Sequence, residues 1–92
     1  MDFEAAMGPD VGMENEQPAT SVTLSFGTRL RALRRARGLS QEGLAHEAGM
    51  DRSYVGGVER GTRNVSLVNL ARLARALGVT LSQLFEEVHH HG

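Results

Sequence analysis

Apolar residues recur at every third or fourth position from Ser25 onward, which is the spacing of side chains on one face of an α-helix. No segment alternates apolar and polar residues in the way that a half-buried strand does. The first stripe, Phe26, Leu30 and Leu33, predicts one helix, and the later stripes predict four more. The predicted fold class is therefore all-α, a compact domain of five short helices.

Glycines and capping residues predict where these helices begin and end. Glycine ends a helix at little cost because it adopts the left-handed conformation without a Cβ clash. Ser, Thr and Asp accept bonds from the free N–H groups at a helix start. The predicted ends are Gly38, Gly49, Gly61 and Gly78, and the predicted caps are Ser40, Asp51, Ser66 and Thr80. Thr80 also forms a capping box with Gln83. In the fourth helix the residues predicted to face inward are Leu67, Leu70, Ala71, Ala74 and Leu77.

Residues 41–60 carry the most specific part of the pattern, two short helical segments joined by a glycine turn. The apolar faces of the two segments consist of Leu44, Ala45 and Ala48 and of Val55 and Val58. The small side chain of Ala45 allows the two helices to approach closely. This arrangement is typical of a helix-turn-helix, whose second helix enters the major groove of DNA.

The second helix of this motif has a polar face that suits a DNA groove. On a helical wheel the residues of this face are Ser53 and Arg60 at its centre, Gly56 and Gly57 beside them, and Arg52 and Tyr54 at its borders. An arginine can bond the O6 and N7 atoms of guanine, and glycines permit close approach to the bases. The alternative is an ordinary solvated helix face, with glycines that mark fraying. The turn, the caps and the nearby arginines favour DNA.

Charge divides the chain into two parts. Residues 1–24 contain five acidic residues and no basic one, whereas residues 25–92 contain all ten arginines and six acids. The net charge of −1 therefore conceals a basic folded region, which is compatible with a polyanionic partner. We predict that residues 1–24 are a flexible acidic tail, or an arm that orders on a partner. The domain is predicted to span residues 25–88.

Composition excludes several other classes of function. The 92 residues suit one domain, and without cysteine there is neither a disulfide framework nor a thiolate metal site. No apolar run is long enough to span a bilayer, so we expect a cytoplasmic protein without a membrane partner. Residues 89–92 are predicted to be a tail, and His89, His90 and His91 more often mark a cloning remnant than a metal site. No catalytic constellation and no cofactor site is evident, so an enzyme is not expected.

The stretches LRALRRARGLSQ, LAHEAGMDRSYVGGVERG and NVSLVNLARLARALGV together resemble the Cro and phage-repressor (XRE) helix-turn-helix family. They match that family in order and spacing over about two-thirds of the chain. Within it, DRSYVGGVERGTRNVSL most resembles the controller proteins of restriction–modification systems. The resemblance implies a five-helix domain of bacterial or phage origin that binds double-stranded DNA.

The resemblance also implies roles for individual residues in DNA contact. Gln41 would bond a phosphate, Arg52 and Ser53 would read bases, and Tyr54 would reach the backbone or a thymine methyl. The residues implied to hold phosphates are Arg60, Arg63 and Asn64.

Four further positions relate to the family pattern, two by matching it and two by departing from it. Arg34 and Glu59 match a pair that forms a buried ion pair between the first and third helices in the family. Gly57 departs from the pattern, because that position often carries a base-reading side chain. Gly43 also departs from it, so Ser40 lacks the partner for a capping box.

The fifth predicted helix carries more apolar surface than the edge of a small domain is expected to bury, which indicates an association site. Its residues are Leu81, Leu84, Phe85 and Val88. We therefore predict a transcriptional regulator that acts as a homodimer on a palindromic operator, of the controller type that regulates its own gene.

Two alternatives stay open at this stage. One is an antitoxin that binds both operator DNA and a toxin, with the acidic tail as the toxin-binding arm. The other is a protein-interaction module that has kept the fold but lost DNA binding.

Overall fold

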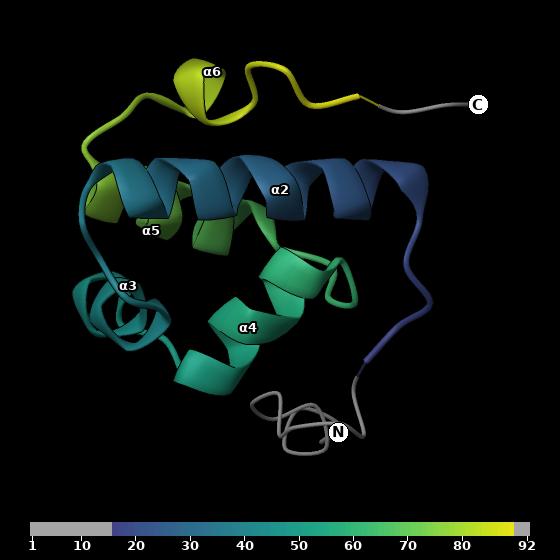
Figure 1. Ribbon diagram of the computed structural model, residues 1–92, viewed down its shortest axis with the longest axis horizontal. Coiled ribbons are helices and arrows are strands. Elements are labelled where there is room, and N and C mark those ends of the chain that lie inside the picture. The colour runs from purple at the N-terminus through teal and green to yellow at the C-terminus, as the bar shows by residue number, and fades with distance from the viewer. Residues whose placement is uncertain (1–15, 90–92) are drawn as a thin grey trace.

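The computed structural model describes residues 16–89, which form five helices and contain no strand (Figure 1). The helices are α2 (Ser21–Ala36), α3 (Gln41–Ala48), α4 (Arg52–Arg60), α5 (Leu67–Leu77) and α6 (Leu81–Leu84). The long α2 crosses the molecule, with α3 and α4 on one side of it and α6 on the other (Figure 1). The predicted all-α class with five helices is confirmed in this part of the chain.

The first helix begins earlier than the apolar stripe predicted. Thr20 caps α2 through a capping box, in which its hydroxyl accepts from the backbone N–H of Thr23 and the Thr23 hydroxyl accepts from that of Thr20. The predicted boundary at residue 24 is therefore wrong, because Ser21 to Leu24 already belong to the helix. The apolar periodicity did not predict this first turn, because the turn is held by local capping hydrogen bonds and its side chains are mostly exposed. Residues 1–15 of the predicted tail lie outside the described residues.

The other helix ends follow local chemistry. Ser40, Ser66 and Thr80 accept cap bonds as predicted, and Thr80 forms the predicted capping box with Gln83. The helix ends at residues 49, 61 and 78 are all glycines with φ between 70° and 84°. Asp51 is the exception, because it stands at the N-cap of α4 without making a side-chain cap bond.

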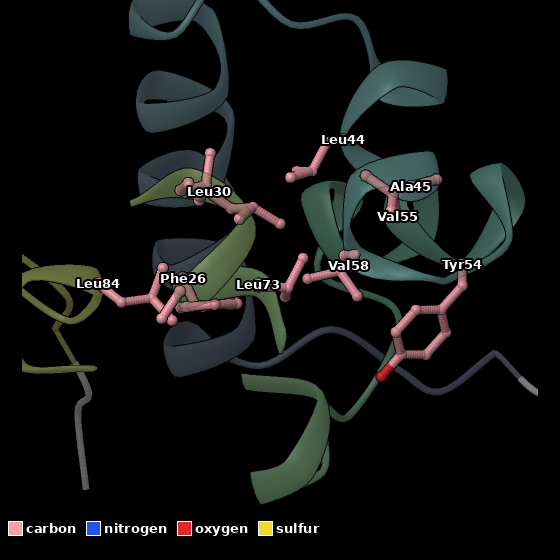
Figure 2. Close-up of a cluster of buried hydrophobic side chains, with 12 residues drawn as sticks. Phe26, Leu30, Leu44, Ala45, Tyr54, Val55, Val58, Leu73 and Leu84 are labelled. Atoms are coloured by element: carbon pink, nitrogen blue, oxygen red, sulfur yellow. The ribbon is translucent and has the colours of Figure 1, made fainter. Parts of the chain in front are cut away.

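The core lies where α2, α4 and α5 meet, with α3 and α6 closing it (Figure 2). The largest fully buried apolar side chains of the described residues are Leu30, Leu44, Val55, Val58, Leu73, Leu77 and Leu84. Leu73 was not among the residues predicted to face inward, whereas Ala71 and Leu67 are exposed, Leu67 by 73%. The buried face of α5 therefore consists of Leu73, Ala74 and Leu77, and it is rotated about the helix axis relative to the predicted face.

Gly27 makes the crossing of α2 and α4 possible. A Cβ atom at this position would lie 2.4 Å from the carbonyl oxygen of Glu59 and 2.6 Å from that of Val58. Both distances are shorter than any van der Waals contact, so only glycine allows the two backbones to approach this closely. The role of Gly27 was not predicted, although a glycine inside an apolar helical stripe is a recognised signal of close packing.

The C-terminal part of the domain folds back over α2. The predicted exposed patch is wrong at its centre, because Leu84 is fully buried and Val88 packs partly against the core. Leu81 and Phe85 remain 39% and 40% exposed, although the Phe85 ring lies 5.4 Å from that of Phe26. Part of the apolar surface of this segment is therefore used to cover the core of its own chain and is not available to a partner. The backbone N–H of His89 donates to Ser25, and residues 90–92 of the predicted tail lie outside the described residues.

Candidate nucleic-acid interface

Helix α4 has one buried and one exposed face, but the exposed face is narrower than the helical wheel predicted, because Tyr54, Gly56 and Gly57 are buried. Val55 and Val58 are 0% and 1% exposed and point into the core, whereas Arg52, Ser53 and Arg60 are exposed. Three positively charged or hydroxyl-bearing side chains therefore lie on the outer surface of a helix held from behind. Such a surface can approach the edges of bases and the phosphates of a duplex.

A hollow of about 270 Å³ lies on this face, above Gly56. It is lined by Glu16, Gln41, Arg52, Ser53, Gly56, Arg60 and Arg63. A Cβ atom on Gly56 would meet only the movable ends of two side chains, at 3.3 Å from Nη1 of Arg60 and 3.6 Å from Oε1 of Gln41. The absence of a side chain at Gly56 thus leaves a recess between residues that were predicted to contact DNA.

Gly57 was predicted to allow close approach of DNA, but in the structure it makes room for the side chain of Arg63. A Cβ atom here would lie 2.7 Å from Cγ of Arg63, so the aliphatic stem of Arg63 occupies the space that a side chain would fill. Arg63 is only 3% exposed, and its guanidinium carbon lies 5.8 Å from the centre of the Tyr54 ring. The predicted role of Arg63 as a surface phosphate contact is therefore wrong for this conformation. The missing side chain of Gly57 thus accommodates an arginine of the same chain.

Tyr54 also turns inward instead of outward. The residue is 7% exposed, and its hydroxyl accepts a hydrogen bond from Nδ2 of Asn69 at 3.2 Å. This bond joins α4 to α5, so the predicted contact with DNA backbone or a thymine methyl is not available to Tyr54. The helical wheel placed Tyr54 at the border between the buried and exposed faces. Its large ring lies on the buried side, where it gains more from burial than a small side chain would. Asn64, in contrast, is exposed after the end of α4.

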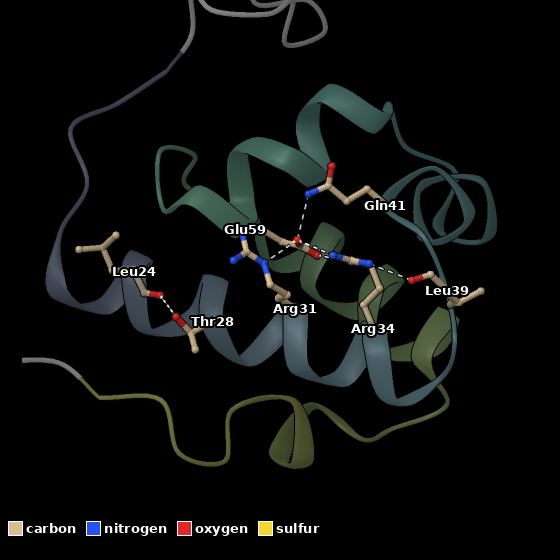
Figure 3. Close-up of polar contacts among 7 residues, drawn as sticks. All are labelled: Leu24, Thr28, Arg31, Arg34, Leu39, Gln41 and Glu59. Carbon is tan, nitrogen blue, oxygen red and sulfur yellow. Dashed lines mark hydrogen bonds and ion pairs between the residues drawn. The ribbon is translucent and has the colours of Figure 1, made fainter.

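The predicted pair of Arg34 and Glu59 is present and buried (Figure 3). Nε of Arg34 donates to Oε2 of Glu59 at 2.6 Å, and its Nη2 donates to Oε1 at 3.0 Å. Nη1 of Arg34 donates to the carbonyl oxygen of Leu39 at 2.9 Å, which ties the α2–α3 loop to the same group. This two-bond geometry is the strongest form of an arginine–carboxylate pair.

Two additional side chains, which sequence analysis did not connect to the pair, also bind Glu59 (Figure 3). Nε2 of Gln41 donates to Oε1 of Glu59 at 3.0 Å, and Nε of Arg31 donates to the same oxygen at 3.3 Å. Burial alone would raise the pKa of the Glu59 carboxyl, but the hydrogen bonds from Arg34, Gln41 and Arg31 outweigh burial and lower that pKa. The hydrogen bond with Glu59 raises the pKa of Arg34 in turn. The carboxylate thus orients Gln41, a predicted phosphate ligand, from inside the protein.

Arg60 is one of two exposed arginines on this face, and it has an acidic neighbour. Its Nη2 atom lies 2.5 Å from Oε2 of Glu16, and its side chain is 52% exposed. This contact could not be predicted from local pattern, because the two residues are 44 positions apart along the chain.

Other kinds of site are not supported among residues 16–89. They contain no group of three His, Cys, Asp or Glu side chains that could hold a metal ion. Within the same residues, no helix is both long enough and apolar enough to cross a membrane.

Comparison with known proteins agrees with this geometry. A family model described as helix-turn-helix matches residues 30–84. The chain therefore belongs to the helix-turn-helix family, whose members are DNA-binding regulators, and the predicted resemblance is confirmed.

The similar proteins include controller proteins, as the run from Asp51 to Leu67 indicated. The chain is 44% identical over 68 residues to control protein C.MunI of Mycoplasma sp, covering 73% of this chain and 92% of that protein. It is 42% identical over 67 residues to control protein C.BamHI of Bacillus amyloliquefaciens, covering 72% and 83%. The crystal structure of the restriction-modification controller protein C.AhdI from Aeromonas hydrophila matches with a TM-score of 0.68 and 63% identity, covering 68% of this chain and 96% of that chain.

Proposed function

We propose that this protein is a sequence-specific DNA-binding transcriptional regulator that acts as a homodimer on a palindromic operator. The observation that carries the proposal is the two-sided α4, with its valines buried and Arg52, Ser53 and Arg60 exposed around the recess at Gly56. A controller-type autoregulator is the specific form that we favour, because the relatives include control proteins of similar length. As a regulator of bacterial or phage genes it would act in the cytoplasm.

Each of the residues proposed to contact DNA has a role that its chemistry allows. Arg52 opens α4 and would bond a guanine, and Ser53 would bond a neighbouring base or phosphate. Arg60, Asn64 and Gln41 would bind phosphates, which set the register of the helix on the duplex without reading sequence.

The experiment that tests DNA recognition is selection from random duplex DNA, followed by titration of the selected duplex and a scrambled one. We expect affinity to fall steeply with salt, because phosphate contacts release counterions. Arg52→Ala should lose about 1–3 kcal/mol on the selected duplex and little on the scrambled one. Arg75→Ala, which removes the same charge from the exposed last turn of α5, is the matched control.

Two results would contradict this assignment. Equal losses for Arg52→Ala on both duplexes would remove Arg52 from base reading. The absence of salt-sensitive binding to any duplex would overturn DNA binding itself and favour a protein-interaction module.

We propose further that the dimer forms through the exposed apolar residues near the C-terminus, Leu81 and Phe85. Leu84 is not part of this surface, since it is buried in its own chain. A two-fold dimer would present its two α4 helices about 34 Å apart, one turn of the duplex.

Sedimentation tests the dimer with two variants that add the same charge to α6. Leu81→Glu should give a folded monomer with weaker operator binding, and Ser82→Glu, on an exposed polar neighbour, should leave the dimer intact. A monomer for the unmodified protein with full operator affinity would contradict the dimer. A dimer that persists in Leu81→Glu would contradict only the surface.

A further inference from the structure

The segment that enters α2 passes over the proposed DNA-binding face and is held there at two points. Oε2 of Glu16 lies 2.5 Å from Nη2 of Arg60. The backbone N–H of the next residue, Gln17, donates to the carbonyl oxygen of Thr62 at 2.8 Å. The Glu16 side chain thus attaches this segment to the last residue of α4, and the Gln17 backbone attaches it to the loop that follows α4.

The carboxylate of Glu16 lies in the recess that DNA would use. Glu16 lines the same hollow as Gln41, Arg52 and Gly56, and its own side chain is only 19% exposed. A carboxylate and a phosphate both accept charge-assisted hydrogen bonds from a guanidinium group, and both place negative oxygens at the same distance from it. Arg60 cannot direct the same donor at both anions at once.

We propose that Glu16 is an intramolecular competitor of DNA phosphate, an autoinhibitory contact that lowers affinity until DNA displaces it from Arg60. The proposal rests on the DNA binding proposed above. The contact suits a competitor because Arg60 is half-exposed, so the ion pair is weak and exchanges readily. The backbone bond from Gln17 to Thr62 keeps the carboxylate close to Arg60, which raises its effective concentration there.

The test compares four proteins with the unmodified one: Glu16→Gln, Arg60→Ala, the double variant, and Glu87→Gln. Glu87 is exposed beyond α6 and lines a different hollow, beside Ser25 and Arg29 of α2, so Glu87→Gln removes the same charge away from the recess. Binding to the selected duplex is measured by fluorescence anisotropy. Elution from immobilised heparin supplies a second polyanion that requires no base recognition, and circular dichroism confirms that each variant is folded.

We expect Glu16→Gln to bind the duplex about two- to fivefold more tightly at low salt, the range of an exposed ion pair. The gain should shrink as salt screens the contact. Glu87→Gln should change affinity less than Glu16→Gln does. In the Arg60→Ala background the Glu16→Gln change should have no effect, because its partner is absent.

Two outcomes would overturn the proposal. One is equal affinity for Glu16→Gln and Glu87→Gln, and the other is a gain that persists without Arg60, which would indicate a general charge effect. If no variant binds any duplex specifically, the proposed function fails. Later elution of Glu16→Gln than Glu87→Gln from heparin would then still support the contact, and equal elution would refute it.

Discussion

Glu59 and Arg60 are neighbours on α4, and each forms an ion pair in opposite surroundings. The side chain of Glu59 is 0% exposed and binds Arg34 across the α2–α4 crossing, whereas that of Arg60 is 52% exposed and binds Glu16. Successive residues of a helix point about 100° apart, so the next residue after a buried one readily faces solvent. The same helix therefore holds one charge inside the fold and offers the next one to a partner.

The two pairs differ in consequence although their distances are similar, at 2.6 Å and 2.5 Å. A buried charge that loses its partner cannot recover its hydration, whereas an exposed one is solvated again at once. The inner pair, Arg34 with Glu59, is thus suited to fixing the position of α4. The outer pair, Arg60 with Glu16, is suited to exchanging one anion for another. Distance alone does not distinguish these roles, but burial does.

The largest effect is expected from breaking the inner pair. Glu59→Gln should lower the free energy of unfolding by about 3–5 kcal/mol in denaturant melts, because it leaves Arg34 buried without a counter-charge. Glu47→Gln, on the exposed face of α3, is the control and should change stability little.

A double replacement sharpens this result. Arg34→Met with Glu59→Leu should lose less than the sum of the two single losses, since no buried charge is left unpaired. If the losses in free energy of unfolding were additive, the inner pair would behave like an exposed pair. The two pairs on α4 would then not differ in their contribution to stability.

Acid should remove the inner pair reversibly. The pKa of Glu59 is lower in the folded protein than in the unfolded chain, so its contribution to stability is complete only above the unfolded pKa of about 4.5. That contribution is lost as pH falls through the folded pKa. The stability difference between the unmodified protein and Glu59→Gln should therefore narrow as melts are repeated at lower pH. A difference independent of pH would show that the Glu59 carboxylate is not what stabilises the pair.

The close crossing behind the inner pair offers a third test. Gly27→Ala should cost about 1–3 kcal/mol, because its Cβ atom would lie 2.4 Å from the Glu59 carbonyl oxygen and force α2 and α4 apart. Gly56→Ala, on the outer side of α4, meets only movable side-chain ends and should be neutral or stabilising. Equal thermal shifts for the two variants would contradict the close approach at Gly27.

The smallest effect on folding should come from the outer pair. Glu16→Gln should change the free energy of unfolding by less than about 1 kcal/mol, because Arg60 is half-exposed. A loss as large as that of Glu59→Gln in the same melts would mean that the segment before α2 is part of the structural core and not a displaceable competitor.

Much of the site could be predicted from short stretches of sequence. The two valines and the exposed Arg52, Ser53 and Arg60 lie where the helical wheel placed them, and the Arg34–Glu59 pair matches the family resemblance. The failures were Tyr54, at a border of the wheel, and Arg63, beyond the end of α4. Tyr54 turned to Asn69 in α5, and Arg63 folded back over Gly57, so each is held by residues that the wheel did not relate to it.

The sequence by itself determined the five helices, most of their ends and the opposed faces of α4. These depend on caps, left-handed glycines and 3.6-residue periodicity, which act between residues a few positions apart. Only the tertiary structure decided that Leu84 belongs to the core, that Gly27 must lack a side chain, and that Glu16 lies against Arg60. Each of these outcomes joins segments far apart along the chain, where burial and direct contact, and not local pattern, select the partner.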